Sequence, residues 1–183
     1  MATMQQTKTA LERVTDRVAN DPDRGKTVYR NRATVEDGTR CQVRDGDMVM
    51  TFDIPPVMGG DGAGPTPGTA LRAALAGCLA IGVKMWAARK NVRIDHIEVN
   101  LEADSDARGQ FALDEKVAPG YGALRAKIDV TSSEADEVIR DVVDQSLKYS
   151  PLLDVVANAQ NITSCVTVHD NSAEQMFLMA SNG

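Results

Sequence analysis

Cys78 is the residue of this sequence best suited to chemistry, because a thiolate is both a nucleophile and a site of reversible oxidation. It lies within a nearly uncharged run at residues 74–82, Ala-Leu-Ala-Gly-Cys-Leu-Ala-Ile-Gly. The small residues around it would let another helix or backbone approach the sulfur closely. On composition alone, simple packing of a buried thiol is the competing interpretation.

The other two cysteines, Cys41 and Cys165, lie in stretches with strand-like composition, where a free cysteine usually behaves as a small hydrophobe. The chain has no CxxC spacing, and its two histidines, His96 and His169, are far apart. Zinc sites need three or more protein ligands, so the sequence predicts no metal site. The scattered cysteines predict reduced thiols instead of a disulfide framework.

A glycine-rich segment, Gly-Gly-Asp-Gly-Ala-Gly at residues 59–64, precedes the run that holds Cys78. It lacks the Gly-Lys-Ser/Thr ending and the GxGxxG spacing of phosphate-binding loops, so it is interpreted as a flexible lid. Thr66 and Pro67 follow, and they suit the N-cap and first residue of a helix. The sequence therefore predicts a helix over residues 67–90 with Cys78 near its middle.

The remaining elements must position this helix. Apolar residues at helical spacing predict a short N-terminal helix at residues 7–18, which Thr9 would cap. Two short β-prone runs separated by Asp-Gly dipeptides predict an antiparallel meander between residues 26 and 54. Further predicted elements are half-buried strands at 97–102 and 124–130, a helix at 133–149, a helical turn at 152–158 and a strand at 162–168.

Size and charge limit the class of protein. The chain of 183 residues, with 43% hydrophobic and 25% charged residues, fits one globular domain. Its net charge of −6 argues against nucleic acid and acidic membrane surfaces as partners. The most apolar stretch, residues 73–83, is shorter than the ~20 residues of a membrane-spanning helix. No secretory signal is visible, so a cytoplasmic location is expected.

Several of these motifs occur together in one known family. The glycine segment, the sequence Gly-Pro-Thr-Pro at residues 64–67, the Ala-Gly-Cys at 76–78 and the Lys-Tyr-Ser-Pro at 148–151 resemble the OsmC/Ohr family over residues 27–168. The family comprises osmotically inducible and organic hydroperoxide resistance proteins. The resemblance implies an α+β fold in which an antiparallel sheet wraps a central buried helix. Two chains would intertwine into a homodimer.

On this basis the chain divides into three parts. Residues 1–25 are an N-terminal helical extension, residues 26–170 are the OsmC-like domain, and residues 171–183 are a loosely held C-terminal tail.

The resemblance also implies a reaction. Active members use a peroxidatic cysteine on the central helix to attack an organic hydroperoxide, and Cys78 occupies that position. An arginine from the N-terminal sheet accompanies the thiolate, for which Arg40 and Arg44 are the candidates, with Arg30 and Arg32 left open. No cofactor is expected.

The sequence departs from the family pattern at two places. Ser150 stands where active members carry the resolving cysteine, and a serine cannot form the disulfide. Gly68 and Thr69 stand where active members carry a glutamate that pairs with the arginine. Resolution would therefore need an external thiol reductant. Cys41 and Cys165 remain open as substitute resolving residues.

Three functions follow from these observations. The first is a one-cysteine reductase of organic hydroperoxides with Cys78 as nucleophile. The second is a non-catalytic homodimer whose interface pocket binds a small hydrophobic ligand. The third is a dimeric scaffold in which Cys78 only packs. The predicted ligand pocket includes Ser150, Met58, Leu75, Met85 and Trp86.

Overall fold

The computed structural model describes residues 3–169 and 174–179, and the chain divides into two compact units, Met1–Ser150 and Pro151–Gly183. Helices combine with antiparallel strands in these units, which confirms the predicted α+β class. The first unit contains α1 (Met4–Asn20), η1 (Pro22–Gly25), β1 (Arg32–Val35), β2 (Cys41–Asp45), β3 (Met48–Phe52), η2 (Pro56–Met58), α2 (Pro67–Lys90), β4 (His96–Ser105), α3 (Ala107–Gln110), β5 (Tyr121–Thr131) and α4 (Asp136–Lys148). The second unit contains α5 (Pro151–Ala157), β6 (Ser164–His169) and β7 (Glu174–Met179).

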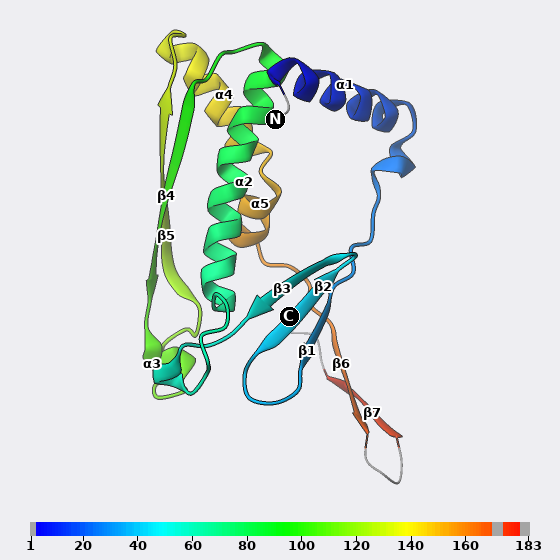
Figure 1. Cartoon of the computed structure of the whole chain (residues 1–183), viewed down its shortest axis with the longest axis vertical. Helices are drawn as coiled ribbons and strands as arrows, with labels where there is room; N and C mark the ends of the chain where they lie inside the picture. The colour runs from blue at the N-terminus through cyan, green and yellow to red at the C-terminus, as the bar shows by residue number, and fades with distance from the viewer. Residues whose placement is uncertain (1–2, 170–173, 180–183) are drawn as a thin grey trace. The chain divides into compact units, whose positions relative to one another are not determined.

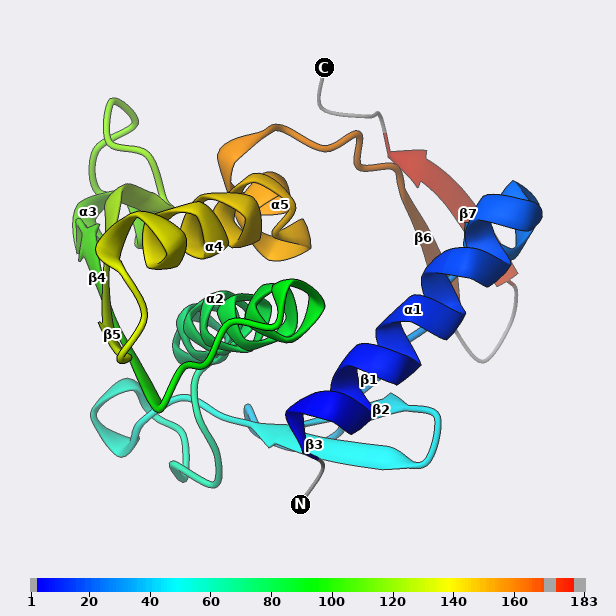
Figure 2. The same cartoon turned by 90° about the horizontal axis from the view of Figure 1, so that it is seen from above.

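Helix α2 is the central helix of the first unit, and α4, α1 and β4 all pack against it (Figures 1 and 2). It begins as predicted, because the Thr66 hydroxyl accepts the Thr69 N–H at 3.1 Å and Pro67 occupies the first turn. It ends at Asn91, which adopts the left-handed conformation with φ 55°. Asparagine tolerates this conformation better than most residues do, so it suits a helix end.

The core of the first unit lies along one stripe of α2. Leu79 and Val83 are fully buried there, and Val142 of α4 packs into the same core with Val92 and Ile94. Other parts of α2 stay open, and Ile81 is 62% exposed. The predicted buried helix is thus buried on one side only within this chain. By length and composition alone α2 would also suffice to cross a membrane, a test that core helices of soluble proteins pass as well.

The sheet formed by β1, β2 and β3 has one apolar and one polar face. Its antiparallel register aligns Ala33 with Val43 and Met50, and Val35 with Cys41 and Phe52. These six side chains share one face with Met48 and Asp45, whereas Arg32, Thr34, Gln42, Arg44, Val49 and Thr51 lie on the other. None of the strand residues of this sheet is buried. Val35 and Met50 on this face are 52% and 39% exposed, and Cys41, Val43 and Phe52 are half-buried, so the described part of the chain covers the apolar face only in part.

The sequence prediction differs from the structure at both ends of the chain. The N-terminal helix begins earlier than residue 7, because Thr3 and Gln6 form a capping box in front of it. The β-prone run at residues 27–29 lies outside every strand, and Tyr29 is 84% exposed. Strand β7 was not predicted, and the rest of the predicted tail lies outside the described residues. The strands predicted at 97–102 and 124–130 are confirmed as parts of β4 and β5.

Candidate active site

Cys78 lies half-buried on α2, where the end of α4 reaches it. Its Sγ is 3.5 Å from the hydroxyl oxygen of Ser150, a hydrogen-bond distance for sulfur. Ser150 follows α4 and is 6% exposed. The structure therefore brings together two of the residues that the sequence analysis selected, although they are 72 positions apart in the chain.

Close packing of the two helices makes this contact. Gly82 lies one turn beyond Cys78 on α2, and a Cβ placed there would be 2.6 Å from the Ser146 hydroxyl. Ser146 lies one turn before Ser150 and is 1% exposed. Its hydroxyl oxygen has no hydrogen-bond partner within the described residues. Glycine at position 82 thus permits an approach that a larger residue would obstruct.

The two candidate arginines, Arg40 and Arg44, have other contacts or positions in the structure than one at the Cys78 sulfur. Arg40 Nη2 lies 3.2 Å from the Asp61 carboxylate in an exposed ion pair. Arg44 lies on β2, on the polar face of the sheet. Neither guanidinium forms a hydrogen bond with the Cys78 sulfur within residues 3–169. Their role beside the thiolate remains a prediction.

A buried carboxylate that the sequence analysis missed fixes the glycine segment. Asp53 is 2% exposed, and its Oδ1 accepts hydrogen bonds from the Thr39 hydroxyl at 2.7 Å and the Ile54 N–H at 2.8 Å. Its Oδ2 accepts the N–H groups of Asp61 and Ala63 at 3.1 and 3.0 Å. The Ala63 N–H and the Thr39 hydroxyl lower the pKa of Asp53 most, and it falls to about 2 although burial opposes the shift.

These hydrogen bonds correct the interpretation of residues 59–64 as a flexible lid. The segment is anchored to Asp53, and a Cβ at Gly64 would lie 2.1 Å from the Thr51 carbonyl oxygen. Gly64 is therefore required for close contact between two backbone segments. An aspartate directly after a strand and near a glycine-rich segment is a sequence pattern that predicts such an anchor only weakly.

A tyrosine occupies the space around Gly68, where the family resemblance led us to look for a glutamate. A Cβ at Gly68 would be 2.9 Å from the Tyr121 hydroxyl, which donates a hydrogen bond to the Gly68 carbonyl at 3.1 Å. Arg72 donates hydrogen bonds to the same hydroxyl and, at 3.2 Å, to Thr69. A longer side chain at position 68 would have to displace Tyr121.

The residues predicted to line a ligand pocket lie in different surroundings. Leu75 is buried on α2, while Met58 lies in η2 and is 41% exposed. Trp86 stacks on Tyr149 with ring centroids 5.4 Å apart. Met85 lines a cavity beside α1. Their shared role in one pocket remains a prediction.

Metal-ligating side chains do not gather anywhere in the described residues, where no group of three or more His, Cys, Asp or Glu side chains could hold an ion. At the Cys78–Ser150 contact a thiol and a hydroxyl meet. A thiol can be oxidised, and a neighbouring hydroxyl can donate to or accept from it.

Comparisons with known proteins agree on one family. The family model described as OsmC-like protein matches residues 60–164, which include most of the glycine segment, α2 and α4. The structure of an OsmC-like protein from Mycoplasma pneumoniae has a TM-score of 0.61 at 16% identity, over 72% of this chain and 89% of that one.

A second structure, an organic hydroperoxide resistance protein from Legionella pneumophila, has a TM-score of 0.53 at 14% identity, over 71% of this chain and 89% of that one. At such identities the likeness concerns the fold alone. No curated protein sequence matches the chain significantly. The family model covers more than half of the sequence, and the chain therefore belongs to the OsmC-like protein family.

Proposed function

We propose that this protein is a thiol-dependent reductase of organic hydroperoxides in which Cys78 is the only cysteine of the reaction. The contact between the Cys78 sulfur and the Ser150 hydroxyl at 3.5 Å carries the proposal. A cysteine at position 150 would be placed to form a disulfide, whereas serine leaves the oxidised sulfur to react with a thiol from outside. The hydroperoxide resistance protein among the similar structures supports the substrate class.

The reaction balances with an external thiol. The Cys78 thiolate attacks one oxygen of the hydroperoxide, the O–O bond breaks, and the alcohol leaves after taking up a proton. The sulfur is thereby oxidised to a sulfenic acid. One external thiol then displaces water to give a mixed disulfide, and a second thiol releases reduced Cys78 as the external disulfide forms.

Residues around Cys78 would position the thiolate and the oxygen that reacts with it. Ser150 can donate its hydroxyl proton to the thiolate or to the oxygen added by oxidation. We also assign Arg40 or Arg44 to the thiolate. Neither forms a hydrogen bond with the Cys78 sulfur within residues 3–169, and a second copy of the chain would supply the one that accompanies the thiolate. The exposed Arg40–Asp61 pair is weak enough to exchange partners, since exposed ion pairs contribute only ~0–1 kcal/mol.

We infer that the working protein is a homodimer. The apolar face of the β1–β2–β3 sheet includes Val43 and Met50 and has no buried residue within the chain. An amphipathic sheet is stable when its apolar face packs against another layer. A second copy of the chain supplies that layer, and the expected cytoplasmic location supplies reducing thiols.

The experiment is consumption of cumene hydroperoxide with dithiothreitol or a dihydrolipoyl compound as reductant. Wild-type protein should consume the hydroperoxide, and Cys78→Ser should lose this activity completely. The matched controls Cys41→Ser and Cys165→Ser should keep it, and a sulfenic-acid probe should label Cys78 after stoichiometric peroxide. A wild-type protein that consumes no hydroperoxide, or that stays active as Cys78→Ser, would overturn the proposal.

Binding of a small hydrophobic ligand without catalysis is the second candidate function. The absence of a second cysteine beside Cys78 favours it, because Ser150 cannot resolve an oxidised sulfur within the chain. If the protein is inactive with every reductant, ligand binding without catalysis is the candidate function that remains.

A further inference from the structure

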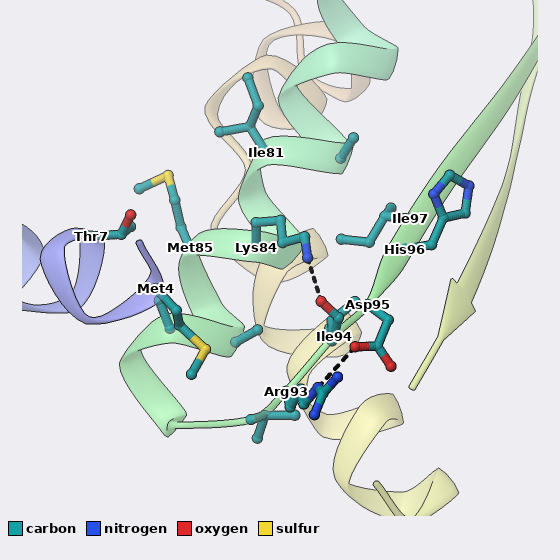
Figure 3. A pocket seen from close by; sticks show the side chains of 14 residues that line it. Met4, Thr7, Ile81, Lys84, Met85, Arg93, Ile94, Asp95, His96 and Ile97 are labelled. Carbon is teal, nitrogen blue, oxygen red and sulfur yellow. Dashed lines mark hydrogen bonds and ion pairs between the residues drawn. The ribbon is translucent and has the colours of Figure 1, made fainter. Parts of the chain in front are cut away.

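Two flanks of α2 have different surroundings. One flank, which includes Ile81 and Met85, lines the cavity between α1 and the start of β4 (Figure 3). The other flank carries Cys78, Gly82 and Trp86, which follow one another at intervals of four residues and therefore form one row along the helix. None of these three residues lines the cavity.

The row on the second flank faces the end of α4. The Cys78 sulfur lies 3.5 Å from the Ser150 hydroxyl oxygen. Trp86 stacks on Tyr149, with ring centroids 5.4 Å apart and 24° between the ring planes. Two consecutive residues, Tyr149 and Ser150, thus contact the row at two points that are eight positions apart on α2.

The backbone hydrogen bonds of α4 alone hold Ser150 only loosely. The helix ends at Lys148, and Tyr149 departs from helical geometry with φ −113° and ψ 22°. The Ser150 N–H donates to the Leu147 carbonyl at 3.3 Å, which is longer than an average hydrogen bond of this kind. Pro151 follows, and a proline has no N–H with which to continue the pattern. Side-chain contacts of this segment therefore contribute to its position.

Two cations strengthen the stacked pair of rings. The Arg89 guanidinium carbon lies 4.7 Å from the centre of the Trp86 ring, and the Lys148 ammonium lies 5.1 Å from the centre of the Tyr149 ring. Both distances fall within the range of cation–π attraction. Stacking and cation–π contacts each favour particular ring orientations. The Tyr149 ring is therefore held at Trp86, although the residue is 57% exposed.

We propose that Trp86 and Tyr149 are positioning residues, which hold the Ser150 hydroxyl against the Cys78 sulfur. They act through the chain, because the stack fixes Tyr149 and thereby the residue that follows it. The step from this position to catalysis rests on the proposed reductase function, in which Ser150 donates to the thiolate or to the oxidised sulfur. The position itself is measured without a hydroperoxide.

A disulfide equilibrium measures how firmly residue 150 is held at Cys78. Full-length Ser150→Cys protein that also carries Cys41→Ser and Cys165→Ser is equilibrated with reduced and oxidised glutathione. The protein disulfide forms as oxidised glutathione is reduced to two thiols, and mass spectrometry counts both protein forms. Tyr149→Ala should lower the equilibrium constant for the protein disulfide by roughly three- to tenfold, the change expected from loss of an aromatic pair.

Two control variants separate positioning from general stability. Tyr149→Phe keeps the ring and should leave the equilibrium constant unchanged. Asp53→Asn removes hydrogen bonds of the glycine segment and none of the stack, so it should lower the stability of the fold without changing this constant. Trp86 is the only tryptophan of the chain, and its fluorescence should shift to longer wavelength in Tyr149→Ala as the stack is lost.

The outcomes separate this proposal from the reductase function. A constant that Tyr149→Ala leaves unchanged would overturn the positioning role, and so would an equal loss in Tyr149→Phe or Asp53→Asn. In protein that retains Ser150, Tyr149→Ala should slow hydroperoxide consumption, and Tyr149→Phe should restore it. A wild-type protein that consumes no hydroperoxide would overturn the reductase function alone, since the disulfide equilibrium would still decide what holds residue 150 in place.

Discussion

At the residue scale, the buried Ser146 hydroxyl, which has no hydrogen-bond partner among the described residues, should lower the stability of the fold. A buried hydroxyl without a partner destabilises a fold by about 1–3 kcal/mol. Ser146→Ala should therefore raise the free energy of unfolding by about 1 kcal/mol, measured by urea denaturation. Ser150, one turn further along the chain, contacts Cys78, and Ser150→Ala serves as a comparison that should not be stabilising.

Gly82→Ala gives the complementary prediction. With Ser146 present, the new methyl group would lie 2.6 Å from the Ser146 hydroxyl. This close contact should lower the free energy of unfolding by about 1 kcal/mol. In the Ser146→Ala background the nearest atom becomes the Cβ at 3.8 Å, an ordinary contact. Alanine is then favoured over glycine in a helix by roughly 0.8–1 kcal/mol. Strictly additive free energies for the double variant would show that the two residues are not in contact.

Ser150→Cys tests the geometry of the candidate site directly. A disulfide bond is roughly 2 Å long, so a sulfur at position 150 has to move only slightly toward Cys78 from the present 3.5 Å. Oxidation of this variant by stoichiometric peroxide should give an intramolecular disulfide, detected by thiol titration and mass spectrometry. Wild-type protein should instead keep a sulfenic acid that traps an added thiol. Failure of the variant to form the bond would contradict the observed proximity.

At the scale of elements, Asp53 makes the glycine segment sensitive to acid. Its pKa of about 2 lies below the ordinary value of 3.8, so ionised Asp53 favours the folded state above about pH 5. This stabilisation is lost as the pH falls toward 2. Asp53→Asn should lower the midpoint of urea unfolding at pH 7. The difference between the midpoints of the variant and the wild type should shrink as the pH is lowered. Asp61→Asn, which changes an exposed ion pair, should alter the midpoint little at any pH.

The sequence predicted the elements with strong local patterns and missed those that depend on distant partners. Thr66 and Pro67 defined the start of α2 because capping is a local interaction. The run at residues 27–29 has β-branched and aromatic residues but pairs with no strand in the described part of the chain, so propensity alone did not make it a strand. Asp53 accepts hydrogen bonds from Asp61 and Ala63 of the glycine segment, 8 and 10 positions away, and from Thr39, 14 positions away, and no local pattern predicts these partners. Cys78 was selected from sequence, and its neighbour Ser150 followed from the family pattern.

At the scale of the whole molecule, the amphipathic sheet of β1, β2 and β3 is the basis for the proposed homodimer. Val43 and Met50 are register partners on the apolar face, and Gln42 and Thr51 are register partners on the polar face. Val43→Lys or Met50→Lys should weaken the dimer by more than about a hundredfold, because each would bury an unpaired charge. Gln42→Lys and Thr51→Lys are the matched controls and should remain dimeric. Sedimentation equilibrium distinguishes these outcomes, and a wild-type monomer at micromolar concentration would contradict the assembly.

The capping box of α1 bears on how the protein should be prepared. Thr3 caps the helix, and Met4, the very next residue, belongs to the cavity wall. A purification tag fused ahead of Thr3 would begin beside this cavity, and a tag rich in hydrophobic residues would fill part of it. Sedimentation and activity measurements should therefore use protein from which an N-terminal tag has been cleaved.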